Sequence, residues 1–259
     1  MEITGGLQNM VDWKITNRKS FNARKPVFIE GLPGLGNVGK IAVDFIVEEV
    51  KAKKVLEFFS YSLPNSVFVT EDNLIEMPKI ELYHKKVGNK DFLFLIGDVQ
   101  PVDEYSSYMF SEKLLDLCQK YNCSEIITLG GIGIDEVPKK PKIFCTGNNA
   151  KLVDTFKSFK VNNNIYGHVG PIVGVSGLLL GLSKKRKLPA ASLLAETFGH
   201  PYYIGFRGAK KILQVLNKKY DFGVSMKKIN SEIRKMESEI NPKKKKKLPS
   251  NQFETSYIG

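Results

Sequence analysis

The sequence predicts an α/β protein in which helices cover both faces of a mixed central sheet, giving a three-layer α/β/α sandwich. Short apolar segments of strand length alternate with amphipathic segments of helix length along most of the chain. Residues 66–97 contain strand-like segments with no helix between them, which indicates some antiparallel pairing. No internal repeat is present and no linker precedes residue 241, so residues 1–240 are expected to form one domain.

The first strand and helix are predicted on either side of a glycine-rich turn. The first 25 residues are polar and mixed, and they are expected to be irregular or an edge element. Residues 26–30 form a short apolar strand that leads into the turn at residues 31–39. Apolar residues then fall on one face of a helix: Val38, Ile41, Ala42, Phe45, Ile46 and Val50. Strand, turn and helix are the first half of a βαβ unit, and the next strand is predicted at residues 54–61.

The rest of the body follows the same two periodicities. Strands are predicted at 67–69, 75–83, 92–96, 126–129 and 143–145, and helices at 104–121, 152–159, 175–182 and 206–220. The strand at 126–129 is expected to end in Gly130 and Gly131, so that Leu129–Gly133 forms a turn.

A last helix, at residues 225–240, has a narrower apolar stripe than the others. The stripe recurs every three or four residues, as in a two-heptad seam: Met226, Ile229, Ile233, Met236 and Ile240. The helix lies either across its own domain or against a neighbouring subunit, and these residues are therefore a possible oligomer interface.

Residues 241–259 change in character and are expected to form a flexible basic tail. Pro242 stops the helix, and the five consecutive lysines at 243–247 repel one another. Fully extended, such a segment reaches about 60 Å, far enough to carry Tyr257 and Ile258 to another molecule.

Composition excludes several classes of function. No apolar run reaches 18 residues, and the N-terminus lacks the pattern of a signal peptide, so no membrane role is expected and the location is expected to be cytoplasmic. The 3 cysteines cannot all pair and are expected to be reduced. The net charge of +12 permits salt-dependent contact with nucleic acid, but no motif predicts specific binding.

The glycine turn is the strongest candidate for catalytic chemistry. Gly34, Gly36 and Gly39 match the dinucleotide-binding fingerprint, and Gly39-Lys40 matches most of a phosphate-binding P-loop. Ile41 stands where the P-loop needs Ser or Thr, and Ser60-Tyr61-Ser62 stand where a dinucleotide fold needs an acid. Two interpretations remain open, a structural tight turn and a nucleotide- or phosphate-binding enzyme.

No other group predicts a catalytic residue, a metal site or a cofactor. Ser176 has a glycine two residues before it, but Leu178 occupies the second glycine position of a nucleophile elbow. His84, His168 and His200 have no partners at metal-ligand spacing. Three acids follow predicted strands or turns and are either active-site groups or turn and capping residues: Asp98, Asp135 and Glu136.

Five blocks taken in order resemble the proteasome assembly chaperone family in its archaeal form. They are Gly31–Lys40, Gly97–Pro101, Leu129–Gly133, Gly174–Gly181 and Ala195–Gly199. The resemblance implies a phosphorylase/hydrolase-like α/β fold without the catalytic residues, formation of homo-oligomers, and binding to the α-subunits of the core proteasome. Members of the family have also been described as ATP-grasp-like enzymes, which only the glycine turn supports here.

The resemblance also implies a docking device, a C-terminal tripeptide of a hydrophobic residue, tyrosine and any residue. The corresponding segment here is Ser256-Tyr257-Ile258-Gly259, in which tyrosine is third from the end and serine precedes it. Either Tyr257 and Ile258 dock in a shifted manner, or the tail binds something else.

Overall fold

The computed structural model describes residues 13–167 and 169–240 and divides the chain into two compact units, Met1–Val224 and Ser225–Gly259. The second unit contains the helix α6 (Met226–Ile240), which confirms the last predicted helix. Whether α6 packs within the chain or between chains stays a prediction, as do the domain limits of 1–240 and 241–259. The tail residues lie outside the described part of the chain.

The first unit contains ten strands and five α-helices between Lys14 and Tyr220. In chain order these elements are β1 (Lys14–Asn17), β2 (Val27–Gly31), α1 (Val38–Glu49), β3 (Lys53–Phe59), β4 (Phe68–Val69), β5 (Ile75–Glu76), β6 (Ile80–Val87), β7 (Lys90–Gly97), α2 (Glu104–Lys120), β8 (Glu125–Ile134), β9 (Ile143–Gly147), α3 (Ala150–Asp154), α4 (Gly174–Lys185), β10 (Ala190–Phe198) and α5 (Phe206–Tyr220). Short 3-10 turns at Leu35–Asn37 and Lys157–Phe159 precede α1 and follow α3.

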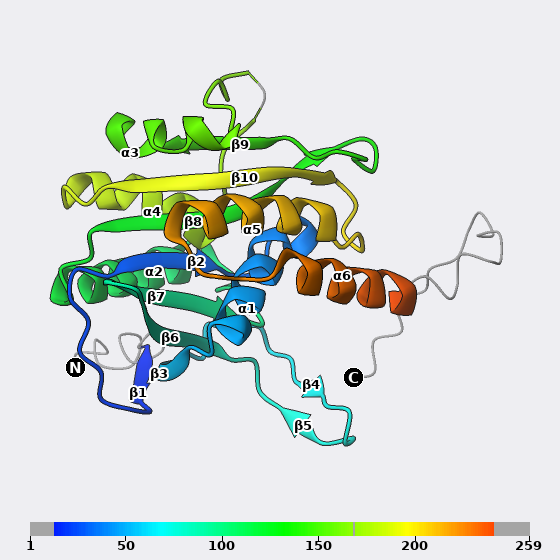
Figure 1. Ribbon diagram of the computed structural model, residues 1–259. Coiled ribbons are helices and arrows are strands. Elements are labelled where there is room, and N and C mark those ends of the chain that lie inside the picture. The colour runs from blue at the N-terminus through cyan, green and yellow to red at the C-terminus, as the bar shows by residue number, and fades with distance from the viewer. Residues whose placement is uncertain (1–12, 168, 241–259) are drawn as a thin grey trace, which may run out of the picture. The chain divides into compact units, whose positions relative to one another are not determined.

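Eight strands form one mixed sheet in the order β1-β3-β6-β7-β2-β8-β10-β9 (Figure 1). The four central strands, β7, β2, β8 and β10, run parallel to one another. The strands outside them, β1, β3, β6 and β9, pair antiparallel with their neighbours, and β1 and β9 are the two edges of the sheet. The antiparallel pairing predicted within residues 66–97 is therefore confirmed.

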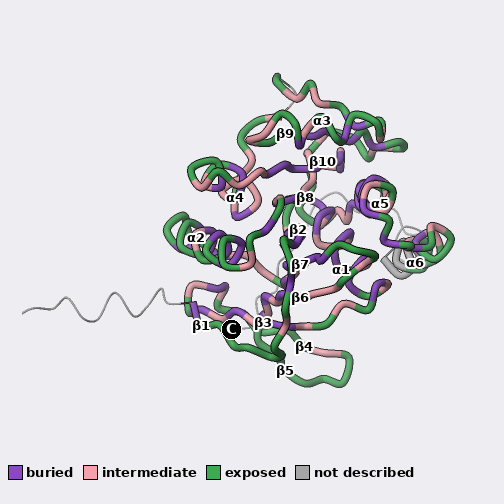
Figure 2. Tube along the Cα trace, turned by 60° about the vertical axis from the view of Figure 1, so that its left-hand side comes forward, coloured by how far each residue is buried: buried purple, intermediate pink, exposed green. Residues whose placement is uncertain are grey.

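Helices cover both faces of this sheet, which confirms the predicted three-layer fold. Helices α2 and α4 contact each other on one face, and α1 and α5 contact each other on the opposite face (Figure 2). Under α2, the Trp13 ring stacks on Phe110 with centroids 4.0 Å apart. On the α5 face, Phe92 meets Phe222 edge-on with centroids 4.8 Å apart. Both contacts bury large apolar rings, which is the main source of favourable free energy in folding.

Two sequence predictions are wrong in detail, and one strand was not predicted. Leu129–Gly133 is not a turn, because β8 continues through it to Ile134. Gly131 lets β8 pack closely against the 3-10 turn before α1, since a Cβ there would lie 2.3 Å from the carbonyl oxygen of Leu35. The strand predicted at 75–83 is divided between β5 and β6, with Pro78, which cannot donate to a ladder, between them. No strand was predicted at Ala190–Phe198, yet β10 is paired on both sides.

The prediction that the cysteines are reduced agrees with the structure. Cys118, Cys123 and Cys145 are buried and free. None of the described helices has both the length and the hydropathy that a bilayer-spanning segment requires.

Candidate functional site

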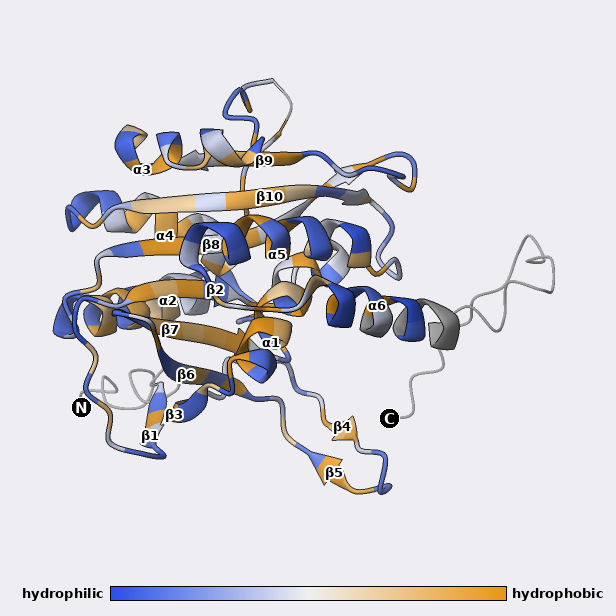
Figure 3. Ribbon diagram, viewed as in Figure 1, coloured by the Kyte–Doolittle hydropathy of each residue, from blue (hydrophilic) through white to orange (hydrophobic). Residues whose placement is uncertain are grey.

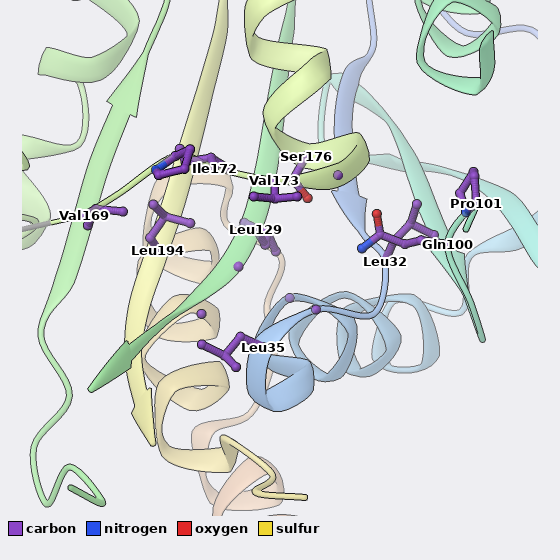
Figure 4. A pocket seen from close by; sticks show the side chains of 16 residues that line it. Leu32, Leu35, Gln100, Pro101, Leu129, Val169, Ile172, Val173, Ser176 and Leu194 are labelled. Carbon is purple, nitrogen blue, oxygen red and sulfur yellow. The ribbon is translucent and has the colours of Figure 1, made fainter. Parts of the chain in front are cut away.

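A cavity of about 520 Å³ lies at the carboxyl end of the parallel strands, between the starts of α1 and α4 (Figure 4). The chain leaves β2 toward α1 on one face of the sheet, and it leaves the adjacent β7 toward α2 on the other face. Such a switch point is where open α/β sheets usually bind ligands. The wall is mainly apolar, with Leu32, Leu129, Ile172 and Leu194 facing the space, and the polar side chains of Gln100 and Ser176 at its border.

Close packing explains two of the three glycines in the predicted phosphate loop. Gly36 has a φ of 64°, and a Cβ there would lie 2.5 Å from Thr197 Oγ1. At Gly39, a Cβ would lie 2.4 Å from the carbonyl oxygen of Leu129. Gly34 differs, because its Cβ would meet no heavy atom within 4 Å and the residue borders the cavity.

Lys40, the predicted phosphate-binding cation, is occupied by acidic partners. Its Nζ lies 2.9 Å from Asp44 Oδ2, one helical turn along α1, and 3.8 Å from Asp98 Oδ1. Burial raises the pKa of Asp44, and the Lys40 ammonium opposes that rise. Since the two carboxylates already attract this ammonium, the geometry weighs against a phosphate role for Lys40, which stays an alternative prediction.

Gln100, in the loop between β7 and α2, joins the loops that begin α1 and α4. Its Nε2 donates to the carbonyl oxygen of Pro33, and its Oε1 accepts from the backbone N–H of Val175 at 3.2 Å. The second bond satisfies one of the N–H groups that every helix start leaves without a partner. Gly174 allows the approach, because it has a φ of 79° and its Cβ would lie 2.8 Å from Gln100 Oε1.

Glu30, at the end of β2, forms a second link beneath the cavity. Its side chain is fully buried; Oε1 accepts from the N–H of Leu32 and Oε2 from Ser176 Oγ, both at 2.8 Å. Burial raises the pKa of Glu30 to about 7, and the two hydrogen bonds oppose that rise. Charged and neutral forms are then close in free energy near neutral pH.

The remaining candidate residues have structural partners or are exposed. Ser176 donates to Glu30, and no histidine is among the described residues that line the cavity. His84 Nε2 lies 2.7 Å from Asp91 Oδ1, and the His200 ring stacks on Phe198. Asp98 Oδ2 accepts from the N–H of Lys79 at 3.1 Å.

Several sequence predictions are left without a structural test. Asp135 and Glu136 are exposed in the loop after β8. His168 lies outside the described residues, as do Ser256, Tyr257, Ile258 and Gly259. Nothing is described for the side chains of Met236 and Ile240 in the possible oligomer interface. Among the described residues, no group of three His, Cys, Asp or Glu could hold a metal ion.

Sequence reasoning missed Glu30 and Gln100 as the residues that link the loops around the cavity. One signal for Glu30 was available, because this glutamate is the only charged residue in an otherwise apolar five-residue strand, β2, that is buried throughout. A carboxyl group in such a strand needs hydrogen-bond partners within the fold. Gln100 carried no comparable signal, since exposed glutamine is common in loops.

Comparison with known proteins gives one family and several similar structures. A model of the PAC2 family matches residues 28–242. The chain is 28% identical over 242 residues to MJ1210, an uncharacterised protein of Methanocaldococcus jannaschii, covering 90% of this chain and 92% of that protein.

Two solved structures from Pyrococcus furiosus match almost their whole length. PbaB, an archaeal proteasome activator, is 31% identical with a TM-score of 0.79, over 89% of this chain and 98% of PbaB. PbaA, an archaeal homolog of proteasome-assembly chaperone, is 25% identical with a TM-score of 0.72, over 88% of this chain and 95% of PbaA.

The packing of the glycine turn predicts opposite results for two alanine substitutions. Gly39→Ala should lower the free energy of unfolding by about 1–3 kcal/mol, because the new methyl group overlaps the backbone of Leu129, which cannot move aside. Gly34→Ala should change it by less than about 0.5 kcal/mol, since no atom lies near its Cβ. Urea unfolding of both variants measures this, and equal losses would contradict the packing explanation.

The raised pKa of Glu30 predicts a pH-dependent contribution to stability. The folded state keeps the proton that the unfolded state releases above its pKa of 4.5, so the contribution is fully present below pH 4.5 and is lost as pH rises through about 7. Glu30→Gln retains an uncharged group that does not titrate. The wild-type unfolding free energy minus that of the variant should therefore fall by on the order of 3 kcal/mol between pH 4 and 8.

Chemical denaturation at a series of pH values measures this difference. Replacing the exposed Glu136 with glutamine is the matched control and should give a nearly flat difference. A flat difference for Glu30→Gln as well would show that the buried carboxyl titrates as it does in the unfolded chain.

Proposed function

The chain belongs to the PAC2 family, and we propose that it is a cytoplasmic, proteasome assembly chaperone-like or adaptor protein without catalytic activity of its own. The observation that carries this proposal is the similarity to PbaB, which extends over 98% of that chain at 31% identity. The similarity to PbaA supports the same class of function. The proposed partners are the α-subunits of the core proteasome.

The geometry of the cavity supports the non-catalytic part of the proposal. Lys40, which follows the glycine turn, is paired with two carboxylates, whereas phosphate binding needs a cation that is available to the ligand. Ser176 donates to Glu30, a carboxyl group that also accepts from the backbone of Leu32 and so connects the loops. The polar groups at this edge serve mainly to connect loops.

The proposed contact with the proteasome is made by Ser256-Tyr257-Ile258-Gly259. A tyrosine ring and a terminal carboxylate can enter a pocket between two subunits, where a lysine of the partner pairs with the carboxylate. In this chain two residues follow the tyrosine, so the ring and the carboxylate would be further apart than in the family's tripeptide. The docking is therefore proposed in a shifted form.

Homo-oligomerisation is the second part of the proposal. The proposed interface residues are those of the apolar stripe of α6: Met226, Ile229, Ile233, Met236 and Ile240. Of these, Ile229 is already buried in the single chain and is the least available to a neighbouring subunit. Two heptads are too short to hold chains together by themselves, so the body of the protein would need to contribute contacts as well.

Removal of the last three residues should abolish proteasome binding. The full-length tagged protein is expected to recover proteasome α-subunits from lysate of the native organism, whereas a chain ending at Ser256 is expected to lose at least about tenfold in recovery, since hot-spot residues carry most of the affinity. Five alanines in place of Lys243–Lys247 are the control for the tail's charge. Equal recovery by full-length and shortened chains would exclude the docking role.

The nucleotide-binding enzyme is the alternative, favoured by the cavity beside Gly34, Gly36 and Gly39. For the adaptor we expect no change in melting temperature with millimolar ATP, ADP or NAD, because a ligand stabilises only a fold that binds it. A saturable rise that disappears in Gly34→Trp, whose side chain would enter the cavity, would favour the enzyme instead.

A further inference from the structure

A short hairpin outside the main sheet exposes a run of apolar side chains. Strands β4 and β5 pair only with each other, and the hairpin of residues 66–77 extends from the body between β3 and β6 (Figure 1). Figure 3 shows both strands as hydrophobic. Its exposed apolar residues are Val67, Phe68, Val69, Leu74, Ile75 and Met77, with Val69 71% and Ile75 68% exposed. An isolated two-stranded hairpin is only marginally stable in water, and exposed apolar surface of this kind marks an interaction site. We therefore expect another surface to cover this hairpin.

The tip of the hairpin is acidic. Residues 66–77 contain Glu71, Asp72 and Glu76 and no lysine or arginine. Glu76 pairs with Lys79 at the base of the hairpin, at 2.5 Å. Glu71 and Asp72 are exposed and form no ion pair with a described residue. The tip therefore presents two free carboxylates beside exposed apolar groups.

A surface of opposite charge lies at the far edge of the sheet, in a cleft of about 570 Å³ between β9 and α5. We call it the lysine cleft, after the four lysines that line it: Lys142, Lys160, Lys211 and Lys218. Its wall also includes the half-buried Phe159 and the buried Ile143 and Val215. No described carboxylate lines the lysine cleft, and the four ammonium groups form no ion pair with a described residue. Four like charges that converge without a counter-charge favour an anionic occupant.

A chain cannot fill its own lysine cleft with its own hairpin. The hairpin leaves the sheet at β3 and β6, and β9 is five strands further along than β6, at about 24 Å. Each leg of the hairpin has about five residues and spans about 17 Å at most. Figure 1 shows β4 and β5 below the sheet and β9 at its upper edge. An acidic, apolar tip and a basic cleft at opposite edges suit a head-to-tail contact between copies.

We propose that the hairpin of residues 66–77 docks with its acidic tip in the lysine cleft of a second copy of this chain. Glu71 and Asp72 supply the counter-charges for the four lysines, and the apolar residues behind the tip cover the rim of the cleft. Contacts of this heterologous kind close into a ring when the rotation between copies permits. Charge complementarity also explains how chains with a net charge of +12 associate in spite of their repulsion.

Charge reversal in the full-length chain tests this contact. One variant carries Glu71→Lys with Asp72→Lys, and the other carries Lys211→Glu with Lys218→Glu. By light scattering over a concentration series, each variant alone should associate at least about tenfold more weakly than the wild type. In the first variant a basic tip faces a basic cleft, and in the second the cleft loses its net positive charge. An equimolar mixture of the two should regain mass toward that of the wild type, since the unchanged acidic tip of one variant again meets the unchanged lysine cleft of the other.

The control is Lys184→Glu with Lys185→Glu at the exposed end of α4. It makes the same change of net charge as Lys211→Glu with Lys218→Glu, and it should leave association unchanged. Unfolding curves must show that all variants fold as the wild type does, as expected for exposed positions. Unchanged mass in both reversed variants, no recovery on mixing, or a monomeric wild type would each overturn the proposal. Weakening by the cleft variant alone would do so as well, since it would mean that another acidic surface occupies the cleft.

This contact rests on the homo-oligomerisation in the proposed function and gives it a specific interface. It does not depend on the proteasome as partner. Loss of the last three residues should leave the hairpin contact intact, and its effect is read from recovery of α-subunits alone. Failure of one proposal is therefore distinguishable from failure of the other.

Discussion

The hydrogen bonds of Glu30 and Gln100 hold together the three loops that meet at the carboxyl edge of the sheet. Glu30 connects the end of β2 to Ser176 in the first turn of α4, and Gln100 connects the loop before α1 to the start of α4. These bonds tie the loop before α1 and the start of α4 to β2 and to the loop after β7. The cavity lies between the two helix starts that the bonds connect.

The same links explain why a sequence with a phosphate-loop pattern can lack its chemistry. Gly36 allows the 3-10 turn before α1 to approach β10, and Gly39 allows α1 to approach β8. Gly174 allows the start of α4 to approach Gln100. Glycine at these positions serves backbone contact, which is one of the roles it also has in nucleotide-binding loops. The difference lies in Lys40, whose charge is directed to Asp44 and Asp98.

Binding to other proteins agrees with the way in which polar and apolar groups are distributed over the first unit. The buried polar groups at the cavity are mostly used internally, whereas six large apolar residues are exposed on the hairpin, and four lysines that form no ion pair with a described residue line the lysine cleft. Surfaces of this kind are typical of proteins that associate. The two proposed contacts of this chain are separate, since one uses the tail and the other uses the edges of the sheet.

Local periodicity was enough to predict the helices and most strands, because an amphipathic pattern reports which face is buried. The strand-like segments without a helix between them at residues 66–97 predicted the mixed sheet, and the odd number of cysteines predicted free thiols. Periodicity could not identify β10, whose residues Ala190–Phe198 show no alternation since both faces of the strand are covered, nor show that Leu129–Gly133 continues a strand. The roles of Glu30, Gln100 and Lys40 depend on partners up to 146 residues away in the chain, so only the packing of distant segments could decide them.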